Sequence, residues 1–262
     1  MADFIRYTVE DKIAVLVIDH PPVNAFNPQT LNELNEALDE LNANPAVKVI
    51  VITGGGQLAF VAGADLGVMG GLLKSRNLAD GSAIIELGQT VFNKFESSNK
   101  PDIAAINGVC LCGGLELAMA CHMRICGDRA RLGQPEINLG IIPGWGGTQR
   151  LQRIIGPAKA TEMILTGDQI TAQQAMQLRL VNMVVPGGEV MRQAKGLAAK
   201  IANKSAVAVA AAMSAIRAGL DADLLDGLAA ERKQFDIVIA SEDALEGVSA
   251  FLEKREAKFQ DK

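Results

Sequence analysis

The sequence predicts an α/β protein in which strand and helix units with a largely parallel sheet are followed by a helical region. Two observations lead to this prediction. Short apolar runs rich in β-branched residues alternate with segments of helical periodicity up to about residue 156, and almost every segment after Pro157 has helical periodicity. The chain has 262 residues, of which 49% are hydrophobic, so it is long enough to bury a core without support from disulfides or a metal.

The first part of the chain is expected to form a hairpin and then a helix. Residues 4–9 and 13–18 have the composition of short strands, and the charged residues between them fit a turn. Asn27 is a suitable N-cap, and Pro28 suits the first helical position because an N–H there would have no partner. Leucines from Leu31 to Leu41 recur at helical spacing, which predicts one apolar stripe that faces the core.

The middle of the chain is expected to continue the alternation of strand and helix. The β-branched run 47–52 predicts a buried parallel strand, and a helical region follows Asp65 and extends to about Glu96. Residues 103–106 predict another buried strand, and a glycine-rich turn then leads into a buried helix that begins near Gly113. The later helical segments are 171–179, 189–203, 206–216, 224–240 and 242–259, with one extended piece at 181–185.

The charge and composition exclude several classes of partner and location. The 25 basic and 30 acidic residues give a net charge of -5, which disfavours nucleic acid or an anionic membrane as the main partner. The first twelve residues include Asp3, Glu10 and Asp11 and no apolar run, unlike a secretory signal or a transit peptide. Four cysteines in a chain of this size are typical of a reducing compartment, so we expect a cytoplasmic protein.

A nearly uniform apolar segment at 103–121 contains one glutamate, Glu116. The length approaches that of a transmembrane helix, but the three glycines and the central glutamate favour a strand, a turn and a buried helix. A carboxylate in such surroundings is costly unless it is paired or functional, so Glu116 is either a catalytic candidate or a structural glutamate bonded to backbone donors or a distant arginine. The N–H of Gly113, at the start of this helix, can stabilise an oxyanion or simply belong to a tight turn.

A second glutamate, Glu136, lies in a loop or at a helix start and is a weaker candidate by itself. Two carboxylates that face one cavity can hold a water molecule, with one taking a proton and the other delivering a proton to carbon. The spacing along the sequence does not show whether Glu116 and Glu136 face each other.

The remaining motifs have ordinary structural explanations. The cysteines 110, 112, 121 and 126, with His122 among them, do not have the spacing of a zinc ribbon or an iron–sulfur site, so we interpret them as buried free thiols and predict no metal. The pattern Gly54-x-Gly56-x-x-Ala59 lacks the helix start and the acidic residue of a dinucleotide site. No Ser/His/Asp set or nucleophile elbow is evident, which disfavours nucleophilic hydrolysis.

Three long motifs resemble the crotonase (enoyl-CoA hydratase/isomerase) superfamily over essentially the whole chain. They are NGVCLCGGLELAMAC, LGQPEINLGIIPGWGGTQRL and LTGDQITAQQAMQLRLVNMVV, supported by HPPVNAFN, FVAGAD and the tail AFLEKREAKF. The resemblance implies a spiral of ββα units with a C-terminal helical region that mediates trimerisation. It places the spiral core at residues 1–195 and the helical region at 196–262, and it implies a homotrimer or a dimer of trimers.

The resemblance also implies the reaction and the residues that perform it. The substrate is an acyl-CoA thioester, and no cofactor is needed beyond the coenzyme A of the substrate itself. By resemblance, Glu116 activates water, Glu136 protonates the α-carbon, and the N–H groups of Ala64 and Gly113 form the oxyanion hole. The residues implied to contact coenzyme A are Ala62, Asp65, Leu66 and, from a neighbouring subunit, Phe251 and Lys254.

Both glutamates are present, which favours hydration of a short trans-2-enoyl-CoA. Two rivals remain within the superfamily: a Δ3-Δ2-enoyl-CoA isomerase, which can work with the Glu136-type residue alone, and a hydratase for a specialised acyl group. A rival from another class is a non-catalytic trimer that binds acyl-CoA. Cys112 departs from the family pattern, since many members have glycine there, and the segment 66–80 is expected to cover the acyl pocket.

Overall fold

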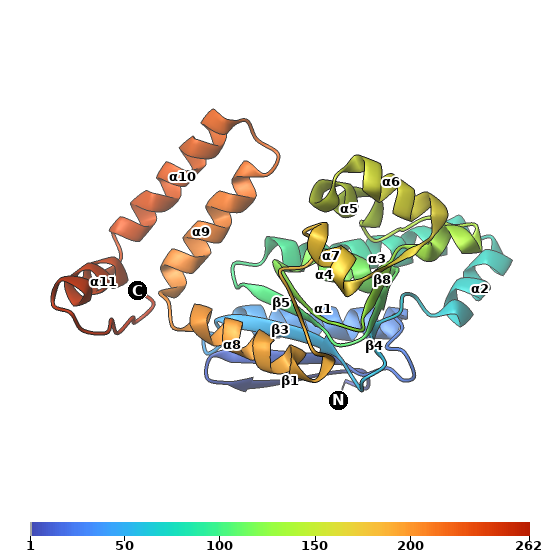
Figure 1. Cartoon of the computed structure of the whole chain (residues 1–262), viewed down its shortest axis with the longest axis horizontal. Coiled ribbons are helices and arrows are strands. Elements are labelled where there is room, and N and C mark those ends of the chain that lie inside the picture. The colour runs from blue at the N-terminus through green and yellow to red at the C-terminus, as the bar shows by residue number, and fades with distance from the viewer. Residues whose placement is uncertain (1) are drawn as a thin grey trace.

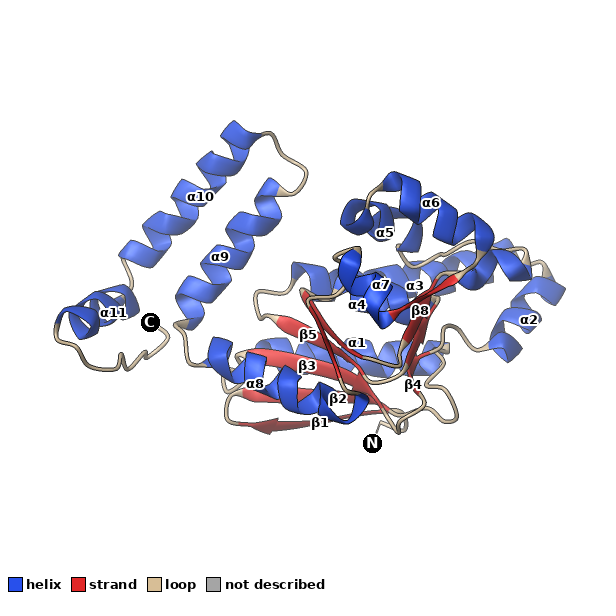
Figure 2. Cartoon of the chain, viewed as in Figure 1, coloured by secondary structure: helices blue, strands red, loops and turns tan. Residues whose placement is uncertain are grey.

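The computed structural model describes residues 2–262, and its strands form two sheets (Figures 1 and 2). The larger sheet has six strands in the order β1-β2-β3-β5-β7-β10. The first two strands form the expected antiparallel hairpin, and the other neighbours are parallel. These strands are β1 (Ile5–Glu10), β2 (Ile13–Ile18), β3 (Val49–Gly54), β5 (Asp102–Ile106), β7 (Met123–Gly127) and β10 (Met183–Val185).

The smaller sheet has four strands in the order β4-β6-β8-β9, and its first three strands are parallel to one another. Parallel strands end at the same edge of a sheet, so the segments that follow β4, β6 and β8 emerge side by side. Those segments contain Ala64, Gly113 and Glu136. The strands are β4 (Ala59–Val61), β6 (Val109–Leu111), β8 (Arg131–Gly133) and the antiparallel β9 (Gln169–Thr171).

The helices begin and end largely where the sequence predicts. Asn27 caps α1 by accepting the N–H of Thr30, and Pro28 occupies the first turn. The helical region after Asp65 is divided into two helices, because Arg76 takes a left-handed conformation with φ 50° that ends the first one. The helices are α1 (Pro28–Ala43), α2 (Leu66–Ser75), α3 (Leu78–Ser97), α4 (Gly113–Ala120), η1 (Pro135–Leu139), α5 (Gly147–Ile155), α6 (Pro157–Thr166), α7 (Ala172–Gln177), η2 (Gly187–Glu189), α8 (Val190–Ala202), α9 (Ala206–Gly219), α10 (Leu224–Ile239) and α11 (Glu242–Leu252).

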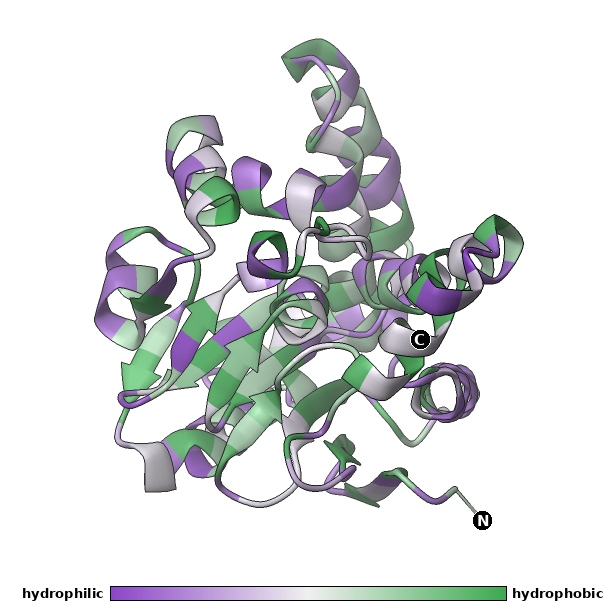
Figure 3. Ribbon diagram, turned by 90° about the vertical axis from the view of Figure 1, so that its right-hand side faces the viewer, coloured by the Kyte–Doolittle hydropathy of each residue, from purple (hydrophilic) through white to green (hydrophobic). Residues whose placement is uncertain are grey.

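The core lies on both faces of the larger sheet, whose strands are mostly apolar (Figure 3). On one face the leucine stripe of α1 is fully buried and packs with α3 and the sheet. On the other face α8 packs closely on the strands through small side chains, among them Ala194 and Ala198, both fully buried. Among residues 2–262, no helix has both the length and the apolar character needed to cross a membrane.

The C-terminal helices leave the body of the protein. Helices α9, α10 and α11 extend away from the sheets (Figure 1) and carry many exposed apolar side chains. The predicted division between residues 195 and 196 falls inside α8, which packs on the sheet as far as Ala202; a division into two domains stays a prediction. The helix predicted at 242–259 is too long, because α11 ends at Leu252 and Lys254 takes a left-handed conformation with φ 57°. The tail then folds back, and the backbone N–H groups of Gln260 and Asp261 donate to the carboxylate of Asp243.

Candidate active site

Glu116 lies in the first turn of α4, immediately behind the edge where β4, β6 and β8 end, and is only 2% exposed. Its Oε1 atom accepts two backbone hydrogen bonds, from the N–H of Trp145 at 2.8 Å and from the N–H of Gly147 at 2.7 Å. No group among residues 2–262 donates a hydrogen bond to its Oε2 atom. One carboxylate oxygen therefore anchors the side chain, and the other remains available for a water molecule.

The turn that holds Glu116 depends on glycine. A Cβ atom on Gly147 would lie 2.7 Å from Pro143 and 3.0 Å from Oε1 of Glu116, so any side chain there would break the anchor. Arg150 reinforces the turn, because it donates to the carbonyl of Trp145 at 3.0 Å and pairs with Glu96 at 2.8 Å. The glycine-rich segment before α5 thus presents two N–H groups to a buried carboxylate.

Glu136 lies in η1, directly after β8, and is 6% exposed. The side chain of Gln134, which is fully buried, lies beside it. With the amide nitrogen turned toward Glu136, Gln134 donates to Oε1 at 2.7 Å and to Oε2 at 3.1 Å. The half-buried thiol of Cys112 lies close enough to Glu136 to influence its pKa.

Burial makes both glutamates easier to protonate than an exposed carboxylate. Burial raises the pKa of Glu116 to about 7, against the opposing effect of the N–H of Gly147, and the nearby charge of Glu136 raises it further. Burial also raises the pKa of Glu136 to about 7, although its hydrogen bonds oppose the shift. The two carboxyl groups are therefore close enough to interact, and both can change protonation near neutral pH.

Two backbone N–H groups at the same edge have no acceptor among residues 2–262. Phe26 forms a parallel bridge with Ala64. The N–H of Phe26 donates to the carbonyl of Gly63, and the carbonyl of Phe26 accepts from the N–H of Asp65. The N–H of Ala64, between these two residues, therefore points away from Phe26. The N–H of Gly113 has no intrahelical acceptor because it belongs to the first residue of α4. The two donors follow the neighbouring parallel strands β4 and β6 and so lie at the same edge of the smaller sheet.

An aromatic cluster supports Gly113 from behind. Trp145 packs edge-on against Phe26 and Phe92, with ring centroids 5.9 and 5.7 Å apart, and its indole N–H donates to the carbonyl of Ile84 at 3.2 Å. A Cβ atom on Gly113 would lie 2.4 Å from this indole. Position 113 therefore requires glycine, and the indole fixes where its N–H lies.

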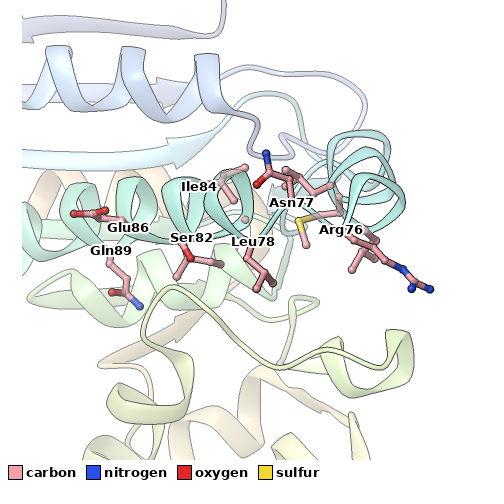
Figure 4. Close-up of a pocket in the computed structure, with 12 residues that line it drawn as sticks. Arg76, Asn77, Leu78, Ser82, Ile84, Glu86 and Gln89 are labelled. Carbon is pink, nitrogen blue, oxygen red and sulfur yellow. The ribbon is translucent and has the colours of Figure 1, made fainter.

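A cavity of about 910 Å³ lies between α2 and α3, next to this cluster (Figure 4). Ile84 and Ile85 line it and also contact the Gly144–Trp145 turn, whose Trp145 N–H binds Glu116; neither glutamate lines the cavity itself. Most of its walls are apolar. Arg76 points away from the space between the helices in Figure 4, and Glu86 and Gln89 lie at the other end of the cavity.

All four cysteines are free; Cys110, Cys121 and Cys126 are buried as expected, whereas Cys112 is half-buried. Within residues 2–262, no group of three or more histidine, cysteine or acidic side chains is arranged to hold a metal. Cys112 takes φ 50° and ψ -126°, a conformation that favours glycine.

The residues expected to contact coenzyme A fall into two separate groups. Ala62, Asp65 and Leu66 follow β4; Asp65 caps α2 by accepting the N–H groups of Gly67 and Val68, and Leu66 is 67% exposed. Phe251 and Lys254 lie at the end of α11, at the opposite end of the molecule from α2 (Figure 1). One chain does not bring the two groups together.

Three contributions to the site were missed from the sequence: the amide of Gln134 and the N–H groups of Trp145 and Gly147. The ring of Trp145 is buried in the core, and the backbone N–H of the same residue binds Glu116. A signal was present for Gln134, a polar side chain directly after a buried strand and two residues before Glu136. The N–H groups carried no such signal, because any residue can present one.

Comparisons with known proteins identify the family of the chain. The chain matches the family model for enoyl-CoA hydratase/isomerase over residues 8–262. It is 43% identical to crotonyl-CoA hydratase of Syntrophomonas wolfei, over 95% of each chain, and 42% identical to short-chain-enoyl-CoA hydratase of Clostridium acetobutylicum, over 94% of this chain and 93% of the relative. A crystal structure of an enoyl-CoA hydratase from Bacillus anthracis superimposes with a TM-score of 0.95 at 37% identity, covering 99% of this chain and all of that one. The chain belongs to the enoyl-CoA hydratase/isomerase family.

Proposed function

We infer that the chain is an enoyl-CoA hydratase, a hydro-lyase that adds water syn across the 2,3 double bond of a short trans-2-enoyl-CoA to give a 3-hydroxyacyl-CoA. The observation that carries this proposal is the pair of buried glutamates, each with a pKa of about 7, beside two backbone N–H groups that have no acceptor in the described chain. The relatives named for hydration of crotonyl-CoA and short-chain enoyl-CoA support it.

The reaction follows from what each group can do. The thioester carbonyl accepts from the N–H groups of Ala64 and Gly113, which stabilise the negative charge that develops on its oxygen; donors of this kind contribute roughly 3–4 kcal/mol. Glu116, ionised, takes a proton from a water molecule on its Oε2 side while the water oxygen bonds to C3. The electron pair of the double bond moves to C2 as an enolate, and Glu136, protonated, delivers a proton to C2.

The cavity between α2 and α3 is the proposed place for the acyl chain. Its walls are mostly apolar, and Ile84 and Ile85 connect it to the turn whose Trp145 N–H binds Glu116. Helix α2 has no buried residue, so this wall is held less firmly than the rest of the site. The proposal agrees with the expectation that residues 66–80 cover the acyl pocket.

The quaternary state and location are also proposals. We expect a homotrimer or a dimer of trimers, because exposed apolar side chains on α9–α11 need cover and because only a neighbouring subunit can bring Phe251 and Lys254 to the Ala62–Leu66 segment. Light scattering of the purified protein tests this expectation. Four free cysteines fit a reducing compartment, so we place the protein in the cytoplasm.

The decisive experiment follows the ultraviolet absorbance of crotonyl-CoA, the conjugated C4 thioester, on addition of the purified protein. We expect a fast loss of absorbance with the wild type and a very slow one with Glu116→Gln. Activity that survives Glu116→Gln on a 3-enoyl-CoA would favour the isomerase. Binding of the ester without turnover would favour a specialised acyl group or a non-catalytic binder.

A further inference from the structure

Arg150 on α5 binds the same residue that anchors Glu116. Its Nη1 atom donates to the carbonyl of Trp145 at 3.0 Å, while the backbone N–H of Trp145 donates to Oε1 of Glu116 at 2.8 Å. The second anchor of Glu116, the N–H of Gly147, lies two residues further along the same turn. Arg150 therefore binds the turn between the two N–H groups that hold the carboxylate.

The guanidinium of Arg150 is itself held from α3. Its Nη2 and Nε atoms donate to Oε2 of Glu96 at 2.8 and 3.1 Å, and Nη2 also donates to the side-chain oxygen of Asn93. The side chain of Arg150 is only 11% exposed. The planar fork of a guanidinium can bind all of these acceptors at once, which a lysine ammonium does not reproduce because it is a point charge on a flexible chain.

The turn leaves room for this guanidinium at Gly146. This residue takes φ 111°, and a Cβ atom on it would lie 2.0 Å from Nη1 of Arg150. Its carbonyl accepts from the N–H groups of Gln149 and Arg150, so the turn and the start of α5 form one hydrogen-bonded unit. The side chain of Arg150 thus links α3 to the turn that presents the N–H groups.

The charged and titratable groups that face Glu116 come from the elements packed around α4. Glu136 lies in η1, the thiol of Cys112 precedes α4, and Arg150 is the positively charged member of this set. Burial raises the pKa of Glu116 to about 7, Glu136 raises it further, and Arg150 opposes both. Strands β4 and β6 carry no charged residue, and Glu96 on α3 pairs with Arg150.

We propose that Arg150 is a positioning residue for the catalytic base: it fixes the turn that anchors Glu116, and it places a positive charge near that carboxylate. The inference rests on the proposed function, in which Glu116 must be ionised to take a proton from water. Arg150 acts through the backbone of Trp145 and takes no part in the proton transfers, because a guanidinium stays protonated.

The test compares Arg150→Met, which keeps an apolar stem but removes the charge and the donors, with Arg153→Met as the matched control. Arg153 lies one turn further along α5, its side chain is 58% exposed, and its hydrogen bonds go to Gln149 on the same helix. With crotonyl-CoA we expect Arg150→Met to lower kcat by roughly 10- to 100-fold with little change in KM, because the base is misplaced. The control should match the wild type.

The pH profile separates this role from a merely structural one. In Arg150→Met the acid limb of kcat/KM should move up by about half a unit, because the loss of a nearby positive charge disfavours the ionised form of Glu116. The basic limb, where Glu136 ionises, should move less. A lower kcat with an unmoved acid limb would overturn the proposal, as would wild-type kinetics.

Arg150→Lys distinguishes the charge from the geometry. Lysine keeps the positive charge but not the planar fork, so the acid limb should stay at its wild-type position while kcat remains below the wild-type value. An acid limb that moves as far in Arg150→Lys as in Arg150→Met would refute the role of the charge.

Glu96→Gln, at a side chain that is 47% exposed, tests the proposal even if Arg150→Met does not fold. It keeps an acceptor for Arg150 but removes the charge that offsets the guanidinium, so the acid limb should move down by roughly a few tenths of a unit. A limb that stays in place or moves up would contradict the proposal. If the wild type is inactive on crotonyl-CoA, the proposed function fails. Titration of the carboxyl carbon of Glu116 by NMR, unchanged between the wild type and these variants, would separately refute the role of Arg150.

Discussion

Replacing Glu116 with glutamine should separate its chemistry from its place in the fold. Both hydrogen bonds to the side chain end on one oxygen, Oε1, and an amide oxygen can accept them equally well. The amide nitrogen then occupies the position of Oε2. Because this nitrogen cannot accept a proton, a water molecule bound there has no general base. We expect kcat on crotonyl-CoA to fall by roughly 10²- to 10⁴-fold, the usual contribution of a general base, with KM nearly unchanged.

The same variant should make the protein more stable at alkaline pH. Burial raises the pKa of Glu116 from an ordinary value of 4.5 to about 7. A group whose pKa is higher in the folded state favours folding below the unfolded pKa and loses that contribution as the pH rises through the folded pKa. The loss between pH 4.5 and 8 is about 3 kcal/mol for this group, and glutamine does not suffer it.

Crotonyl-CoA kinetics and thermal unfolding at pH 4.5 and pH 8 check both parts. The variant should unfold roughly 5 °C higher than the wild type at pH 8 and close to it at pH 4.5. Turnover near the wild-type rate would remove Glu116 from the mechanism. A variant that is less stable at pH 8 would mean that the charge itself holds the turn at Trp145 and Gly147, and the reasoning from burial would be wrong.

Three further outcomes are expected. A plot of the wild-type kcat/KM against pH should be bell-shaped around pH 7. Activity should fall at acid pH because Glu116 becomes protonated, and at basic pH because Glu136 ionises. A flat profile from pH 5 to 9 would contradict these roles. Gly113→Ala should place a Cβ atom against the indole of Trp145. We expect the free energy of unfolding, measured with denaturant, to fall by about 1–3 kcal/mol, and kcat on crotonyl-CoA to fall by at least 10-fold. Unchanged values in both measurements would exclude the clash. Dialysis against a chelator should leave the rate unchanged, and lost activity restored by a divalent metal would revive a metal site.

Much of the fold could be read from local patterns. The hairpin, the cap at Asn27, the stripe of α1 and the start of α4 near Gly113 each follow from a few neighbouring residues, because caps, turns and helical periodicity are local. The prediction of the C-terminal helix is wrong because a distant contact ends it early, where the tail returns to Asp243. The break before α3 was missed because the left-handed backbone of Arg76 leaves no mark in the sequence pattern.

The two glutamates and the glycine-rich turns could be identified from the amino-acid sequence, and Glu116 became a candidate because burying a carboxylate in an apolar helix is costly unless it is paired or functional. The interaction of Glu116 with Glu136 could be seen only in the folded chain, since the strands before them are neighbours in the smaller sheet but twenty residues apart in the sequence. The tertiary structure also determines which atoms hold them. Backbone N–H groups and a buried amide carry no distinctive sequence signal, because their direction depends on how β6, β8 and the turn before α5 pack together.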